Sequence, residues 1–213
     1  MGLLNIIYKG VGVLKRIVFD RLDYLITVYK FKCLGVHYKA FETSGVPFVD
    51  VARGAASSIT IGTGLRMNNG SYRNQIGFGC LKCTIIADGG NIQIGENLGM
   101  SQTALLAFGA DIIIGNNVKI GGGVRIYTTD FHSLHYANRR NKKTDSPTCK
   151  HADVTVGNDC FIGAGSIILK GVTIGDRAII GAGSVVTKNV PSDSIYAGNP
   201  ATEIRRIEYV EDV

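Results

Sequence analysis

The sequence has little of several residue types that mark common protein classes. Among its 213 residues there is no tryptophan and only 4 are proline, which excludes a collagen-like or proline-rich chain. Aromatic residues make up 8%, so platforms for stacking nucleic-acid bases are scarce. Charged residues make up 19% against 45% hydrophobic residues, which argues against disorder and predicts one compact domain.

Disulfide and export signals are also lacking. The 5 cysteines are odd in number and irregularly spaced, which favours a reducing compartment. A single CxxC motif, Cys80–Cys83, has no second pair, and we interpret these thiols as buried small side chains. The N-terminal residues lack the basic region of a signal peptide, and no apolar run reaches the roughly 18 residues of a membrane span. We therefore expect a cytoplasmic protein.

The net charge of +6 would favour binding to a nucleic acid, an anionic membrane surface or a polyanionic ligand. No zinc-finger or helix-turn-helix signature accompanies it, so no nucleic-acid partner is expected. Residues 3–31 mix apolar and basic residues and predict a helix. Two alternatives stay open for this helix. It packs on its own domain or a neighbouring subunit, or it makes weak contact with the inner face of an anionic membrane.

Glycine is abundant, at 28 of 213 residues, and it belongs to a repeat of six. From residue 156 every sixth residue is valine or isoleucine: Val156, Ile162, Ile168, Ile174, Ile180 and Val186. Four residues after each stands a small or apolar side chain: Cys160, Ser166, Val172, Ala178, Ser184 and Val190. The same frame continues upstream at Ile114, Ile120 and Ile126, and at Ile94, Met100 and Leu106 with small partners Leu98, Ala104 and Ala110.

A period of six fits neither a helix nor an ordinary strand. A helix of 3.6 residues per turn would scatter these side chains around its surface, and a two-faced strand repeats every second residue. One short strand plus one turn does fit, with glycine and Asn or Asp at the corners. Three such units close a triangular coil, and stacked coils form parallel sheets.

The strength of this frame divides the chain. It is strong over 94–126 and 156–190, weak over 59–93, and slips by two residues between 106 and 114. We therefore expect an N-terminal helical or irregular segment over 1–58, a solenoid over 59–190, and a C-terminal loop and tail over 191–213. Residues 130–152 interrupt the solenoid as a polar, basic inserted loop, a place suited to binding or chemistry.

Three segments together resemble a known family. They are the tandem hexads, Ile126-Tyr127-Thr128-Thr129-Asp130-Phe131-His132-Ser133 at the start of the insertion, and Val186-Thr187-Lys188 followed by Ala197-Gly198-Asn199-Pro200-Ala201. They resemble the hexapeptide-repeat acyltransferases over roughly residues 59–207, and most closely the maltose, galactoside, capsule and lipopolysaccharide sugar O-acetyltransferases. The resemblance implies an all-β fold, a left-handed parallel β-helix with triangular coils.

The resemblance also implies a reaction, acetyl transfer from acetyl-CoA to a sugar hydroxyl of a surface-polysaccharide or glycolipid precursor. His132 occupies the place of the general base, and imidazole suits that role because its ordinary pKa lies near neutral pH. Asp130 either holds the imidazole tautomer, as a triad carboxylate does, or caps a turn; a backbone carbonyl is a further alternative. Galactoside-type members carry asparagine where this chain has Ser101. Its hydroxyl would bind the acceptor or an oxyanion, or Ser101 is only a small inward-facing corner residue.

The family binds acetyl-CoA in a groove between subunits, which implies a homotrimer and no metal. The positions matching its cofactor contacts are Ala164, Ala182, Thr187, Lys188 and Arg205. Small corner residues let the backbone approach the ligand, while the two basic residues offer charge to phosphates. A basic run at 139–143 either attracts an anionic ligand or is a solvated loop.

Other functions share this type of sequence. Within enzymes, the alternatives are a serine O-acetyltransferase and an acyl-carrier-protein-dependent acyltransferase. A γ-type carbonic anhydrase would need zinc held by three histidines, which only His132, His135 and His151 could supply, and their spacing departs from that pattern. A non-catalytic solenoid is the remaining class.

Overall fold

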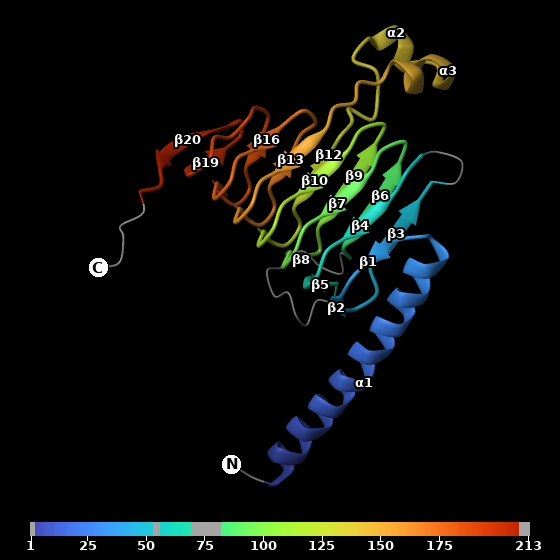
Figure 1. Ribbon diagram of the computed structural model, residues 1–213, viewed down its shortest axis with the longest axis vertical. Helices are drawn as coiled ribbons and strands as arrows, with labels where there is room; N and C mark the ends of the chain where they lie inside the picture. The colour runs from blue at the N-terminus through green and yellow to red at the C-terminus, as the bar shows by residue number, and fades with distance from the viewer. Residues whose placement is uncertain (1–2, 53–55, 70–81, 209–213) are drawn as a thin grey trace.

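The computed structural model of the chain is a long helix followed by a three-sided coil of short strands (Figure 1). It describes residues 3–52, 56–69 and 82–208, with side chains from residue 18 onward. Helix α1 (Leu3–Cys33) extends away from one end of the coil, and an arm with two short helices projects from its side (Figure 1). Cys80 of the CxxC motif lies outside the described residues.

Three sheets form the sides of the coil. From β1 to β18 consecutive strands pass from one sheet to the next, and neighbouring strands within each sheet pair in parallel. The last strand, β20, pairs antiparallel with β19. Sheet A contains β1 (His37–Tyr38), β4 (Ile59–Ile61), β7 (Ile92–Ile94), β10 (Ile112–Ile114), β13 (Val154–Val156) and β16 (Thr173–Ile174). Sheet B contains β2 (Phe41–Ser44), β5 (Leu65–Asn68), β8 (Gly99–Ser101), β11 (Lys119–Ile120), β14 (Phe161–Ile162), β17 (Ile179–Ile180), β19 (Ser194–Gly198) and β20 (Ala201–Arg206). Sheet C contains β3 (Phe48–Val51), β6 (Thr84–Asp88), β9 (Ala104–Phe108), β12 (Arg125–Tyr127), β15 (Ile167–Ile168) and β18 (Val185–Val186).

The hexad positions of the last coils form the core, as the sequence predicts. All the valines and isoleucines of the frame from Val156 to Val186 are buried, and so are their small partners from Cys160 to Val190. Equivalent hexad positions of successive coils lie side by side, as Ile162 and Ile180 do on neighbouring strands of sheet B. Each coil therefore contributes a layer of branched side chains to one continuous apolar interior.

The corners are built from residues in the left-handed backbone region. Asn97, Asn117, Asp159, Arg177 and Asp193 have φ values between 56 and 60°. Asn and Asp tolerate this region better than branched residues, which explains their recurrence at four of these five corners.

Glycine serves a second need at the corners, because successive coils approach closely there. A Cβ added to Gly157 would lie 2.7 Å from the backbone nitrogen of Asp176 in the next coil. Side chains reinforce the same stacking. Asn116 N–H donates to Asn158 Oδ1 at 2.9 Å, and Asn158 N–H donates to Asp176 Oδ1 at 2.7 Å.

The frame upstream of the insertion differs from the prediction by one residue. On β9 the inward side chains are Leu105 and Ala107, whereas Leu106 and Ala104 are only half-buried. The frame shifts at the preceding corner, where Gln102 has a φ of 47° and Thr103 is fully buried. One change of register therefore precedes Leu105. A second falls before Ile114, as predicted, because Leu105 and Ile114 are nine residues apart where the hexad frame expects six.

The solenoid is longer than predicted at both ends. It begins with β1, β2 and β3, which pair in parallel with β4, β5 and β6, so the first coil lies within the segment expected to be helical or irregular. Its inward Phe41 and Val49 are eight residues apart around Pro47, a spacing that hides the hexad period. At the other end, β19 pairs with β17 and turns back into β20 where a loop and tail were expected.

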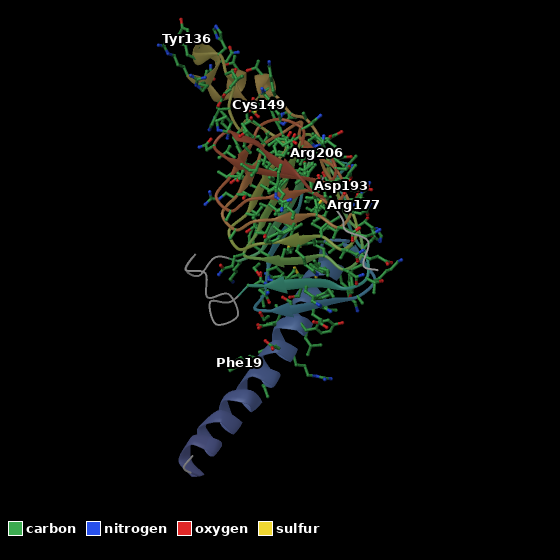
Figure 2. All side chains as sticks on the ribbon, turned by 90° about the vertical axis from the view of Figure 1, so that its left-hand side faces the viewer. Phe19, Tyr136, Cys149, Arg177, Asp193 and Arg206 are labelled. Carbon is green, nitrogen blue, oxygen red and sulfur yellow. The ribbon has the colours of Figure 1, made fainter. Side chains whose placement is uncertain are left out.

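The C-terminal hairpin is fixed to the coil by side chains. Arg177 Nε and Nη2 donate to the two carboxylate oxygens of Asp193 at 2.6 and 2.7 Å. Arg206 donates from Nη1 to the carbonyl oxygen of Ser192 at 2.9 Å. Figure 2 shows Arg177, Asp193 and Arg206 gathered at this end of the molecule. The bidentate geometry fixes the turn that starts the hairpin.

One face of α1 packs on the first coil. The ring of Phe31 is buried 5.0 Å from that of Phe41, and Tyr24 stacks 4.9 Å from the same ring. Asp23 Oδ2 accepts a hydrogen bond of 2.8 Å from Gly45 N–H. The expectation that the helix packs on its own domain therefore holds for this face. Among the described residues, no helix has the length and apolar character needed to cross a bilayer.

Candidate functional site

The inserted loop forms a short arm that carries His132 at its base. The arm leaves the coil after β12 and contains α2 (Tyr136–Arg139), α3 (Lys142–Asp145) and a 3-10 turn (Ser146–Thr148). Figure 2 shows Tyr136 at the outer end of the arm and Cys149 where the chain returns toward the coil.

A carboxylate of the arm binds the imidazole of His132. Asp145 Oδ2 lies 2.7 Å from His132 Nδ1, and Asp145 Oδ1 accepts a hydrogen bond of 2.7 Å from Ser133 N–H. A carboxylate at Nδ1 selects the tautomer protonated there, which leaves the lone pair on Nε2. The His132 side chain is 69% exposed, so a substrate can reach it.

Asp145 is held in its ionised form. The hydrogen bond with His132, followed by that from the Ser133 backbone, lowers the pKa of the Asp145 carboxyl below its ordinary value. Its side chain is only 13% exposed, so it lies between the arm and the imidazole. Sequence reasoning missed Asp145 as the partner of His132. It could have been found as the only acidic residue in 131–152.

Asp130 does not orient the imidazole, contrary to one of the predicted alternatives. Its Oδ1 lies 2.7 Å from Lys170 Nζ on the following coil, and its buried Oδ2 has no hydrogen-bond partner among the described residues. The reason is the backbone of Phe131, whose φ of 62° turns the chain between the two residues. Asp130 therefore faces the coil while His132 faces the arm.

Aromatic rings support the base of the arm. Phe131 packs edge-on against Tyr127 at 5.1 Å and against Phe108 at 6.0 Å between ring centroids. Burial beside them raises the pKa of the Tyr127 hydroxyl, so that this group stays neutral. The strained conformation of Phe131 is thus held by packing next to the imidazole.

The basic run of the arm is divided between structural and exposed positions. Arg139 donates from Nη1 to the carbonyl oxygens of Ser133 and Leu134 at 2.7 and 2.8 Å. Arg140 lies over the ring of Tyr136 at 5.2 Å. The lysines of the run, at 142 and 143, are exposed on α3. Arg139 therefore fixes the segment that follows His132.

Ser101 ends β8 on sheet B, away from the arm. Its Oγ accepts a hydrogen bond of 3.1 Å from Asn68 Nδ2 on the neighbouring strand β5. Both line a shallow cavity of about 270 Å³ together with Arg66 and Lys119. Sequence reasoning missed Asn68 because it lies where the hexad frame is weak. The structure thus places an amide directly beside the Ser101 hydroxyl.

Ala164 and Ala182 lie on the same corner of successive coils. Gly183 N–H donates to the Ala164 carbonyl at 2.8 Å, and a Cβ on Gly163 would lie 2.5 Å from the backbone nitrogen of Ala182. Small side chains at this corner leave the backbone accessible from outside.

Thr187, Lys188 and Arg205 lie on other parts of the surface. Thr187 and Lys188 are exposed and follow β18 at the corner between sheets C and A. Arg205 is exposed on β20, with Nη1 donating to the carbonyl of Arg206 at 3.1 Å.

The predicted residues fall on two edges of the coil. Ser101, Ala164 and Ala182 share the edge between sheets B and C, whereas the arm with His132 starts from the edge between sheets C and A, where Lys188 also lies. A five-residue strand such as β9 separates the two edges by roughly 16 Å. Within the part of the chain that the structure describes, no hydrogen bond or ion pair joins His132 to Ser101.

Two other histidines and Cys83 pack against neighbouring residues of the fold. His135 stacks on Tyr136 at 5.2 Å, and His151 lies against Gly109, whose added Cβ would meet the imidazole at 2.8 Å. Cys83 is fully buried, and burial raises the pKa of its thiol to about 11. Over residues 3–52, 56–69 and 82–208, no group of three or more histidine, cysteine or acidic residues is placed to hold a metal ion.

A three-sided coil of hexads with a histidine-bearing arm defines the class of hexapeptide-repeat transferases. The family model of bacterial transferase hexapeptide repeats matches residues 153–188. The chain is 40% identical over 123 residues to protein CapG of Staphylococcus aureus, covering 56% of this chain and 69% of CapG. It is 38% identical over 119 residues to galactoside O-acetyltransferase of Escherichia coli, covering 56% of each. The chain belongs to the hexapeptide-repeat acetyltransferase family.

Solved structures show the same architecture over most of the chain. A maltose O-acetyltransferase from Clostridium difficile is 25% identical, with a TM-score of 0.53 over 92% of this chain and 88% of that one. A hexapeptide-repeat acetyltransferase from Vibrio cholerae is 24% identical, with a TM-score of 0.53 over 91% of each chain. By sequence, the chain spans 56% to 69% of the length of the two curated relatives named above.

Proposed function

We propose that this protein is an acetyl-CoA-dependent O-acetyltransferase that acts on a sugar hydroxyl of a surface-polysaccharide or glycolipid precursor. The observation that carries the proposal is the exposed His132–Asp145 pair at the base of the arm. Relatives named as galactoside and maltose O-acetyltransferases support the reaction class. We also propose that the coils wind in the left-handed sense, as the resemblance to the hexapeptide-repeat acyltransferases implies.

In the proposed reaction each group has one step. His132 Nε2 accepts the hydroxyl proton of the sugar as its oxygen attacks the thioester carbonyl of acetyl-CoA. Asp145 holds the Nδ1 proton and stabilises the imidazolium that forms. The tetrahedral intermediate then collapses, the carbon–sulfur bond breaks, and the leaving thiolate takes the proton from Nε2. The products are the acetyl ester of the sugar and free CoA thiol.

The remaining predicted residues are assigned to binding. Ser101, with the amide of Asn68 beside it, supplies hydrogen bonds to the acceptor or the oxyanion. The backbone at Ala164 and Ala182 receives the pantetheine arm of acetyl-CoA. The exposed Thr187, Lys188 and Arg205 are placed for its phosphates. We propose no metal in this reaction.

Acetyl-CoA turnover against a panel of sugars tests this function, with free thiol release as the readout. We expect thiol release with at least one sugar and a slower reaction with serine. A chain that binds no acetyl-CoA, or that releases thiol only with serine, would contradict the proposal.

We propose a homotrimer in which each site combines two chains. The division of the predicted residues between two edges supports this, because one edge of a copy can meet the other edge of the next under three-fold symmetry. The site is incomplete in a single chain.

Mixed trimers test this arrangement. Neither His132→Ala nor Ala182→Trp alone is expected to be active, since the first lacks the base and the second fills the donor groove. Coexpressed, they should recover activity at about a quarter of the sites, those with an intact histidine and an intact groove on adjacent chains. Sedimentation as a monomer, or trimers without recovered activity, would count against the shared site.

We also propose that the protein works at the cytoplasmic face of a membrane through the outer face of α1. Exposed apolar side chains, between 38 and 70% accessible, form a stripe opposite the packed face: Val18, Phe19, Leu22, Leu25, Ile26 and Tyr29. The helix carries six basic residues against two acidic ones, which favours an anionic lipid surface. Figure 2 shows Phe19 on the part of the helix that extends away from the coil.

Vesicle sedimentation tests the membrane contact. Replacing Leu22 and Leu25 together by glutamate is expected to weaken binding to phosphatidylglycerol-containing vesicles at least tenfold, because two buried leucines contribute about 1.5–3 kcal/mol each. Ile204→Glu is the matched control, since Ile204 is 61% exposed on β20. Equal vesicle binding by all variants, or a change in oligomeric state instead, would refute membrane contact.

A further inference from the structure

A second, larger cavity lies between α1 and the first strands of sheet B. Its volume is about 570 Å³, within the range of small-molecule sites. The walls come from one turn of α1 and from β2 and β5. The lining residues that matter for recognition are Arg21, Tyr24, Phe41, Ser44, Arg66 and Asn68.

The lining combines aromatic faces with polar groups. Tyr24 and Phe41 offer apolar surface, while Arg21, Arg66 and Asn68 offer hydrogen-bond donors. Such a mixture fits sugar rings, which present C–H faces and hydroxyl edges together.

One buried hydroxyl in the cavity has no partner. Ser44 is 3% exposed, and its Oγ forms no hydrogen bond with any residue that the structure describes. Its Oγ is enclosed by protein, so it adds a polar group behind the wall of the cavity and not a contact that a ligand reaches directly.

The cavity adjoins the pocket that contains Ser101. Arg66 and Asn68 line both, and Asn68 donates directly to Ser101 Oγ. The resulting trough runs across sheet B from β2 to Lys119 on β11, three strand spacings or roughly 14 Å. That length exceeds a single sugar ring.

We propose that this trough binds the sugar units of an oligosaccharide acceptor that flank the acetylated unit. The inference rests on the proposed O-acetyltransferase function and adds that the natural acceptor is a glycan of several units. The unit at Ser101 is the one that reacts, and its neighbours extend toward α1 over the shared Arg66 and Asn68.

A length series of acceptors tests the trough in the full chain. The probes are one- to five-unit oligomers of glucose, galactose, N-acetylglucosamine and sialic acid, each assayed by thiol release from acetyl-CoA. For the sugar type that is turned over, kcat/KM should rise at least tenfold from one unit to the length that fills the trough. A kcat/KM that does not change with length would overturn the trough and leave the transfer reaction intact. Release with no sugar of any length would remove the proposed function and the trough with it.

A double variant tests whether the dependence on acceptor length comes from the trough. Arg21→Ala combined with Arg66→Ala should reduce the ratio of kcat/KM for long over short acceptors at least tenfold, because the added sugar units would lose their charge-assisted hydrogen bonds. Arg125→Ala, an exposed arginine on sheet C, is the matched control and should keep the ratio. An unchanged ratio in the double variant would overturn the assignment. A change in its sedimentation would do the same, by marking the trough as a contact between copies.

Discussion

Replacing His132 by alanine is expected to lower kcat for acetyl transfer by about 10²–10⁴-fold, the range that a positioned general base contributes. The loss should fall on kcat, because a sugar hydroxyl is a poor nucleophile until its proton is accepted. The affinity for acetyl-CoA, measured by calorimetry, should stay within about twofold, since the proposed donor groove does not include the imidazole. The fold should also survive, because the side chain is 69% exposed and its removal leaves no core cavity.

His135→Ala is the matched control for this experiment. His135 is an exposed histidine of the same arm, and its ring stacks on Tyr136 instead of contacting a carboxylate. It should retain activity within a few-fold. Equal activity of the two variants would show that His132 is not the base, and lost acetyl-CoA binding in His132→Ala would show a role in the donor site instead.

The regular part of the fold is predictable from the sequence because its information is local. Each hexad specifies one strand and one corner, and stacking only repeats the contact between like positions such as Ile162 and Ile180. The pattern fails where the corners change length. At Gln102 and Thr103 the register shifts by one, and in the first coil Phe41 and Val49 are not six residues apart.

Only those site residues that belong to a sequence motif could be predicted from the sequence. His132 stands in a short segment that resembles the family, and the structure places it at the base of an exposed arm. Its partner Asp145 lies thirteen residues away in a segment without period, so only the folded arm brings the two together. Asp130 is near in sequence, but the turn at Phe131 points it toward Lys170. Proximity along the chain is thus a poor guide where the backbone reverses.

Asp145→Asn is expected to lower kcat at least tenfold and toward the roughly 10⁴-fold cost of a wrong tautomer in a catalytic triad. An amide can donate to Nδ1, which would move the imidazole proton to Nε2 and remove the base. The KM for acetyl-CoA should not change, and Asp145→Glu should restore part of kcat. Asp130→Asn, which removes the charge opposite Lys170, should destabilise the fold while keeping kcat within a few-fold. If instead Asp130→Asn lost kcat and Asp145→Asn did not, the carboxylate assignment would be reversed.

The same substitution has a pH signature. The pKa of the Asp145 carboxyl is lower in the folded protein than in the unfolded chain, first because of the hydrogen bond with His132 and then because of that from Ser133. A lowered pKa stabilises the fold above the unfolded pKa, and this stabilisation is lost as pH falls through the folded pKa. Urea unfolding should therefore show wild type more stable than Asp145→Asn at neutral pH, with the difference shrinking in acid. A difference that stayed constant with pH would mean that Asp145 acts through packing and not through its charge, and the tautomer argument would fail with it.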